Sequence, residues 1–453
     1  MSTVSNVNPI KNKPKFIEYF KESIFHATLC TARKAGSEVY KNTVNKINNL
    51  KYARELNGKI TIQDIFRDNW DSFVKSQMNK GKVIRQSIID NVDSMIHCRD
   101  FSYGYLFFEC TNCNNFHIQG LSCHSRFCAS CGKKYRDARA NEISSTCIAV
   151  PHRHITWTIA KELRKFFRYY NELYDELFEA VKDVLTNMIT GKSKRAKRKG
   201  KTLGFISTIH TFGRDLKHNP HIHTLVAEVT IDRFGERKSF THFNYNLMRK
   251  SFMTVLLNRM QNFLKNYGTK DLYNEFIQIK MNLYKSKNNG FYVHAPRTNV
   301  KNYKDIKKLV NYVCRYAGHP AISESRILEY NKEKKTITYC YDPHEDDAIL
   351  NDEDKIGTQY VTETIDEFIA KLIVHIPNKS VHTTRYYGFY ANRSNINLSK
   401  ERKLFSQNEL KTMKDNLSWR IRLLNSYKYD SLLCECGHYM VLNIEHSYLN
   451  IGG

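Results

Sequence analysis

Residues 217–225 read Lys-His-Asn-Pro-His-Ile-His-Thr-Leu, and this stretch decides how the central part of the chain folds. Apolar and β-branched residues run on from it to Thr230, and residues 204–211 form a similar run before a polar turn. Such runs are typical of strands, so the two are predicted to pair as a β-hairpin. Side chains two apart on a strand point the same way, which places His221 and His223 on one face.

Two imidazoles on one strand face can hold a metal ion. His210 lies on the preceding strand, where a cross-strand neighbour can supply a third imidazole and leave positions open for water or phosphate. His218 is the alternative third ligand. The chain has 18 His, so a His-x-His pair also arises by chance, and His210 can equally be a core histidine.

A pair of tyrosines lies further along, in the sequence Tyr312-Val313-Cys314-Arg315-Tyr316. The surrounding segment, residues 307–317, is predicted to be helical, and side chains four apart share a helix face. A phenolate can attack a phosphodiester to form a phosphotyrosine, and two tyrosines allow two successive transesterifications. Because the chain has 28 Tyr, an aromatic core is the alternative interpretation.

Six cysteines lie between positions 98 and 131. Cys110 and Cys113 form one Cys-x2-Cys pair, and Cys128 and Cys131 form another after fourteen intervening residues. Two such pairs predict one structural Zn²⁺ held by four thiolates; free buried cysteines are the alternative. Candidates for a second site are Cys98, Cys123, His117 and His124. Five basic residues lie in or just after this module: Arg126, Lys133, Lys134, Arg136 and Arg139. They are candidates for DNA contacts, and a solvated basic surface is the alternative.

The charge of the chain points to a polyanionic partner. Lys and Arg number 71 against 45 Asp and Glu, a formal net charge of +26 in 453 residues. No apolar run approaches a membrane helix, and residues 1–15 lack the apolar stretch of a signal peptide, so a cytosolic protein is expected. Twelve cysteines in a reducing compartment favour metal binding over disulfides.

The chain is long enough for about two to four folding units. We expect a helical region over 1–95, the zinc module over 96–147, a domain with the histidine hairpin and the tyrosine helix over 148–330, and a C-terminal region over 331–453. Within the third, residues 154–159 are predicted as a strand and 163–188 as one long amphipathic helix. Residues 191–201 are predicted to be an exposed basic loop, and residues 336–341 a further strand.

In content and order these features resemble the rolling-circle insertion-sequence transposases, the two-tyrosine members of the HUH (histidine, hydrophobic, histidine) endonuclease superfamily. The resemblance covers about residues 64–440. Its further marks are the stretches 122–132, 210–216, 322–326, 367–369, 375–377 and 385–391. Relatives tend to end with Cys-x2-Cys-Gly, whereas Cys434 and Cys436 here are separated by one residue, which argues against a metal site at the C-terminus.

The resemblance implies an α+β fold, an antiparallel sheet with flanking helices. It implies that His221 and His223 bind Mg²⁺ or Mn²⁺ and, by similarity to the three-histidine sites of conjugative relaxases, it favours His210 as the third ligand. Tyr312 or Tyr316 would attack single-stranded DNA at a transposon end, giving a 5′-phosphotyrosine and a free 3′-hydroxyl, and the strand would pass to target DNA near the bacterial nucleoid. The alternatives are a rolling-circle replication initiator and a non-catalytic zinc-ribbon DNA-binding protein.

Overall fold

The computed structural model describes residues 60–100, 103–113, 115–191, 200–295, 303–316, 321–343, 357–378, 381–398, 401–418, 420–421, 430 and 432–449. The chain divides into two compact units. The first contains Met1–Ile60, His97–Cys123 and Arg420–Gly453, and the second contains Thr61–Ile96 and His124–Trp419. None of the helices in the described ranges is long and apolar enough to cross a bilayer.

The first unit contains a three-stranded antiparallel sheet in the order β12-β1-β2. Its strands are β1 (Gly104–Glu109), β2 (Phe116–Gly120) and β12 (Val441–Leu449). β12 lies at the other end of the sequence from β1, and the two pair from Gly104 opposite Leu449 to Glu109 opposite Val441. This long-range pairing brings the residues just before β12 to the end of β1.

The second unit is built on a sheet in the order β11-β4-β5-β3-β7, with β6 paired to β5, and every pairing is antiparallel. The strands are β3 (His152–Thr158), β4 (Thr202–Phe212), β5 (His218–Ile231), β6 (Arg237–Ser239), β7 (Tyr292–His294) and β11 (Thr384–Tyr387). The predicted hairpin is therefore β4 and β5, with its turn at residues 213–217. The strand expected over 154–159 is β3.

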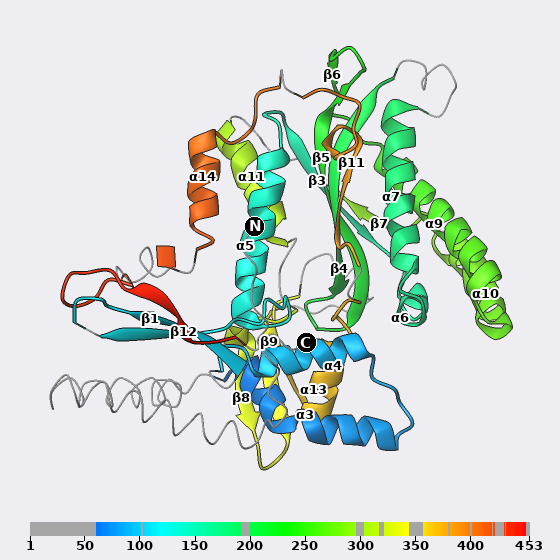
Figure 1. Ribbon diagram of the computed structural model, residues 1–453. Helices are drawn as coiled ribbons and strands as arrows, with labels where there is room; N and C mark the ends of the chain where they lie inside the picture. The colour runs from blue at the N-terminus through cyan, green and yellow to red at the C-terminus, as the bar shows by residue number, and fades with distance from the viewer. Residues whose placement is uncertain are drawn as a thin grey trace. The chain divides into compact units, whose positions relative to one another are not determined.

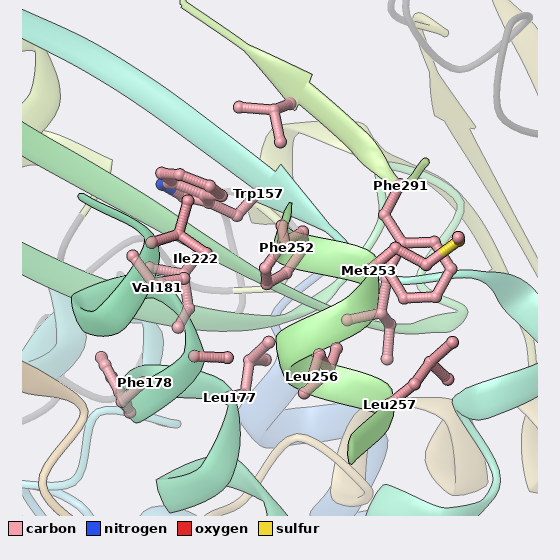
Figure 2. Close-up of a cluster of buried hydrophobic side chains, with 14 of the residues drawn as sticks. Trp157, Leu177, Phe178, Val181, Ile222, Phe252, Met253, Leu256, Leu257 and Phe291 are labelled. Atoms are coloured by element: carbon pink, nitrogen blue, oxygen red, sulfur yellow. The ribbon is translucent and has the colours of Figure 1, made fainter. Parts of the chain in front are cut away.

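One face of this sheet is covered by helices α7, α9 and α10 (Figure 1). Their bounds are Leu173–Thr190, Tyr245–Tyr267 and Lys270–Ser286, preceded by the short η2 (Lys161–Leu163) and α6 (Phe166–Tyr169). Trp157 of β3 and Ile222 of β5 project into this layer and are completely buried there. Figure 2 shows Trp157 and Ile222 packed among side chains of α7 and α9, such as Val181 and Phe252.

The opposite face of the sheet is covered by α5 (Ala129–Thr146) and α11 (Tyr303–Tyr316), as Figure 1 also shows. Their buried side chains, including Ile143, Val310 and Val313, pack against Ile206 of β4 and Leu225 of β5. The 3-10 turn η4 (Gly388–Tyr390) contributes to the same cluster, and α14 (Gln407–Asp415) packs against α5. The sheet therefore lies between two helical layers.

A smaller substructure completes the second unit. It consists of α3 (Ile62–Asn79), α4 (Gln86–Ile96), η3 (Glu324–Arg326), β8 (Ile327–Asn331), β9 (Thr336–Tyr341), β10 (Gln359–Thr364) and α13 (Ile365–Ile373). The three strands form an antiparallel sheet in the order β10-β9-β8, and α13 packs on β9, β10 and α3.

The α+β fold with antiparallel sheets and flanking helices is confirmed, as are the helical segments after residue 61 and the strand over 336–341. The single long helix expected over 163–188 is wrong. The chain breaks at Tyr170, which caps α6 in an extended conformation (φ −128°, ψ 103°), and α7 begins only at Leu173. The apolar spacing continues through the break because both pieces bury side chains in the same core. Residues 1–59 and most of the expected basic loop, residues 192–199, lie outside the described residues.

Candidate functional site

Three histidines of the β4–β5 hairpin, His210, His221 and His223, lie on the sheet face that α11 covers. His210 of β4 lies directly opposite His221 of β5, and Thr208 lies opposite His223. Alternation along β5 sends Ile222 to the other face, where it is buried in the core. All three imidazoles consequently project from the same patch of the sheet.

The ring nitrogens of His210, His221 and His223 converge, since one nitrogen from each ring lies within 4.8 Å of the others. His210 and His223 are buried and His221 is half-buried. Nδ1 of His221 lies 2.7 Å from the carbonyl oxygen of Asn219, so in the neutral ring Nδ1–H donates and Nε2 carries the lone pair. Burial, together with His210, His221 and His154, lowers the pKa of His223 well below its ordinary value. His223 is therefore a neutral imidazole, the protonation state that binds a metal.

A fourth histidine, not anticipated from the sequence, contacts this group. His154 lies on β3, whose Thr156 pairs with His223, and its Nε2 lies 2.9 Å from Nδ1 of His223. Burial and the nearby His294 and His221 lower the pKa of His154 to about 4. The available signal was strand alternation: His154 and Thr156 share the face of the sheet that carries the histidine cluster.

Tyr312 reaches the edge of the histidine cluster from α11. Val310 and Val313 anchor this helix in the core below the sheet, while the Tyr312 side chain is 44% exposed. The Tyr312 ring packs edge-on against His154, with ring centroids 6.4 Å apart and planes at 75°. Tyr312 and the histidine cluster are thus joined through one intervening imidazole. Tyr316 ends α11, and its side chain lies outside the described residues.

His218, the alternative third ligand, does not belong to the convergent group. Three positions separate it from His221, and an odd separation places the two side chains on opposite faces of a strand. Its Nε2 lies 3.0 Å from the hydroxyl of Tyr174 on α7, and its ring stacks on His375. His375 in turn contacts the Thr211 hydroxyl and the Leu216 carbonyl, so these histidines fix the hairpin turn.

The first unit contains a cluster of four cysteines, Cys110, Cys113, Cys434 and Cys436, whose sulfur atoms all lie within 4.8 Å of one another. The Sγ atoms of Cys110 and Cys436 are 3.5 Å apart, and those of Cys113 and Cys434 are 3.3 Å apart. Gly437 supplies the positive φ of +84° that the C-terminal turn needs, and its N–H donates to the Cys434 carbonyl. Four thiols at this spacing fit a structural Zn²⁺.

This grouping differs from the one expected from sequence spacing. Cys110 and Cys113 lie beside the C-terminal pair, whereas Cys128 caps α5 in the second unit and Cys131 lies in the first turn of that helix. The one-residue spacer between Cys434 and Cys436 therefore does not exclude a C-terminal metal site, because it still allows both thiols to face Cys110 and Cys113. The cause is the pairing of β1 with β12, which no local spacing reveals.

The remaining candidates for the zinc module divide between the units. In the first, the backbone N–H of Cys123 lies 3.5 Å from the sulfur of Cys98. In the second, His124 is exposed and has a positive φ of 54°. The role of these residues in a second site stays a prediction.

The basic residues of this module have different environments. Lys133 and Lys134 are exposed on α5, and Arg136 is half-buried with its Nε 3.5 Å from Asp137. Arg126 is half-buried, and its guanidinium donates to the Thr383 hydroxyl at 2.9 Å. Among the five basic residues expected here, Lys133 and Lys134 are the two that are exposed.

Comparison with known proteins gives two family matches. Residues 204–397 match a family described as a putative transposase, and residues 65–159 match a transposase zinc-binding domain. The chain is 27% identical over 318 residues to the transposase for insertion sequence element IS801 of Pseudomonas savastanoi pv. phaseolicola, covering 68% of this chain and 72% of that one. It is 22% identical over 341 residues to the putative transposase y4qJ of Sinorhizobium fredii (strain NBRC 101917 / NGR234), covering 73% and 80%. No solved structure gives a significant match.

Proposed function

The chain belongs to the family of insertion-sequence transposases that includes the IS801 transposase, and from that premise we propose that it cuts and rejoins single-stranded DNA through a tyrosine. Its substrates would be one strand at a transposon end and a target strand, as in rolling-circle transposition. The net charge of +26 supports a DNA partner, because lysine and arginine contacts to phosphates supply most of the non-specific affinity.

The observation that carries this proposal is the convergence of three imidazoles beside a helix that presents Tyr312. His210, His221 and His223 would hold a divalent cation, which when bound polarises the scissile phosphate. Imidazole donors suit Mn²⁺ better than Mg²⁺, which prefers oxygen ligands. The same donor set therefore predicts higher activity with Mn²⁺ at low metal concentration.

His154 would position His223 rather than contact DNA. If Nε2 of His223 binds a cation, its Nδ1–H would donate to Nε2 of His154 at 2.9 Å, the Thr156 hydroxyl being further away at 3.4 Å. This requires His154 to be unprotonated on Nε2. The lowered pKa of His154, about 4, keeps it neutral at physiological pH.

The reaction would consist of two transesterifications. The Tyr312 oxygen attacks the phosphorus, a P–O bond to tyrosine forms, the bond to the 3′-oxygen breaks, and the phenolic proton is transferred to give a free 3′-hydroxyl. A 3′-hydroxyl then attacks the phosphotyrosine, restores the phenol and rejoins the DNA. Because no bond to water forms, the energy of the phosphodiester is kept and no external energy source is needed.

A covalent-adduct assay tests the proposal. The full chain is incubated with single-stranded oligonucleotides of a transposon end and Mn²⁺, and protein-linked DNA is measured on denaturing gels. We expect an adduct with the wild type, loss of at least about 1,000-fold in Tyr312→Phe, since the nucleophile is removed, and no change in Tyr267→Phe, an exposed tyrosine on α9.

Tyr316→Phe distinguishes the two phenols. If Tyr312 attacks first, Tyr316→Phe forms the first adduct normally and fails in a later strand transfer. An adduct that persists in Tyr312→Phe but disappears in Tyr316→Phe would assign the first step to Tyr316. A wild type that binds DNA but forms no adduct with any end would favour a DNA-binding regulator instead.

A further inference from the structure

A cavity of about 290 Å³ lies beside the histidine hairpin, wholly within the second unit. Aromatic side chains contribute much of its wall: Phe127, Tyr135, Phe212 and His375. A smaller hollow shares Phe212 and His375 with it and reaches His210. The rings of Phe212 and His210 stack with centroids 5.4 Å apart, so the cavity wall is in direct contact with a proposed cation ligand.

The polar group that distinguishes this cavity is the guanidinium of Arg126, which lines both hollows. It donates to the Thr383 hydroxyl at 2.9 Å, and its Cζ lies 5.5 Å from the centre of the Tyr135 ring. No Asp or Glu is among the residues that line either hollow, and no ion pair within the described part of the chain includes Arg126. Arg85, which lines the smaller hollow, likewise donates to the Asn378 side chain and to the Ile376 carbonyl rather than to a carboxylate.

Partial burial of a guanidinium that has no carboxylate partner costs desolvation free energy, and a bound anion would offset that cost. Burial lowers the pKa of Arg126 below its ordinary value, which is the expected signature of this desolvation. The segment that carries Arg126 is also held in place: the Ser125 hydroxyl donates to Asn91 at 3.0 Å, and a Cβ at Gly132 would lie 2.5 Å from the Arg126 carbonyl oxygen. The charge is thus fixed in position before any ligand arrives.

We infer that this cavity binds one nucleotide of the single-stranded DNA close to the cut, with a phosphate on Arg126 and the base against the aromatic walls. The inference rests on the proposed function. An arginine fork matches phosphate geometry, aromatic faces stack on unpaired bases, and the cavity volume suits a single nucleotide rather than a duplex. The exposed lysines of α5 would contact other phosphates of the strand and would not select a particular nucleotide position.

A position-by-position scan of the DNA tests the inference. Oligonucleotides that carry one abasic site, or one uncharged methylphosphonate, at each position near the cut are compared in the adduct assay and in equilibrium binding to the full chain. With the wild type, we expect one abasic position to weaken binding about 5- to 150-fold, the range for one stacked base. One neighbouring methylphosphonate should also weaken it, by about tenfold, as one charge-assisted contact is lost.

The Arg126→Gln variant decides whether the cavity is responsible. It should lose the response to that one methylphosphonate while keeping the wild-type response at all other positions. Lys287→Gln, which removes an exposed cation on a residue that does not line the cavity, should leave the response at every position as in the wild type. Thermal unfolding checks that Arg126→Gln folds; otherwise Arg126→Lys is used, and it should show a reduced response at the same position.

The outcomes separate the two proposals. A flat scan, or an Arg126 variant that responds to the critical methylphosphonate as the wild type does, overturns the nucleotide pocket while adduct formation still supports the proposed function. Absence of any adduct from the wild type overturns the proposed function itself, and the pocket near the cut with it.

Discussion

The histidine centre and the cysteine cluster are both groups of metal-binding side chains, but they are assembled over very different distances along the chain. His210, His221 and His223 lie on two strands joined by a short turn. Cys113 and Cys434 are 321 positions apart and meet because β1 pairs with β12. One group is local, and the other depends on the pairing of two strands that are far apart in the sequence.

This difference predicts different consequences of mutation. The histidines project from a sheet whose core is formed by Trp157, Ile222 and the helices around them, so we expect this sheet to stay folded when no cation is bound. The cysteine cluster lies at the end of a small three-stranded sheet with few buried side chains of its own. A small unit of this kind commonly draws its stability from the metal. Loss of a histidine should therefore affect chemistry, and loss of a cysteine should affect folding.

The largest effect is expected from His223→Ala. Removing a buried imidazole of the convergent group should weaken cation binding and reduce adduct formation by about 1,000-fold or more, because the metal contributes several kcal/mol to stabilising the developing charge. Adduct formation across a Mn²⁺ titration measures this, with His242→Ala, an exposed histidine, as the control. A variant that forms adduct at the wild-type rate would remove His223 from the centre.

Cys434→Ser should produce the next largest effect, and of a different kind. We expect it to lose one zinc per chain and to destabilise the first unit by several kcal/mol, since structural zinc contributes folding energy directly. Metal analysis and limited proteolysis after residue 420 measure both. Cys340→Ser, on β9 outside the cluster, is the matched control and should change neither. Full zinc content in Cys434→Ser would contradict the β1–β12 cluster.

Features formed within one segment could be predicted from the sequence, whereas features that depend on the pairing of distant strands could not. The histidine hairpin, the strand over 336–341 and the helix carrying Tyr312 are each indicated by residue patterns within one segment of the sequence. The grouping of Cys110 and Cys113 with Cys434 and Cys436 could not be predicted from local patterns. Cys128 and Cys131 have the Cys-x2-Cys spacing typical of zinc ligands, and only the pairing of β1 with β12 shows that the C-terminal pair lies beside Cys110 and Cys113. His154 was missed for a related reason: its strand was predicted, but not that the strand pairs with β5 at Thr156 opposite His223.

His154→Leu tests whether His154 on β3 supports cation binding by the histidines of β4 and β5. The substitution removes the nearer acceptor for Nδ1 of His223 and leaves only the Thr156 hydroxyl at 3.4 Å, so it should weaken Mn²⁺ binding about 10- to 100-fold, the usual cost of losing such a supporting hydrogen bond. His154→Gln, whose side-chain oxygen can still accept, should restore much of the affinity. If both variants bind Mn²⁺ equally and as tightly as the wild type, His154 serves only as packing beneath Tyr312.

The smallest effect expected concerns acid pH and the scaffold of the histidine centre. His152, on β3, is completely buried; its Nδ1 lies 2.8 Å from the Val150 carbonyl and its Nε2 lies 2.8 Å from the Tyr390 hydroxyl. Burial lowers its pKa to about 4 from the ordinary value of 6.5. More than about one unit above pH 6.5 the ring is almost entirely neutral whether the chain is folded or unfolded, so it contributes little pH dependence there.

Between pH 6.5 and 4 the unfolded chain takes up a proton that the folded chain does not, so stability falls as the pH falls. From pH 6.5 to pH 5 this amounts to at most about 2 kcal/mol, at 1.36 kcal/mol per pH unit. Urea unfolding of the wild type and of His152→Phe at several pH values measures it. The variant, which cannot bind the proton, should show a shallower decline whatever its absolute stability. If the unfolding free energy of the wild type and of His152→Phe declined equally with falling pH, His152 would be hydrated or already protonated in the folded sheet. Water would then reach this part of the sheet more easily than its hydrogen bonds indicate.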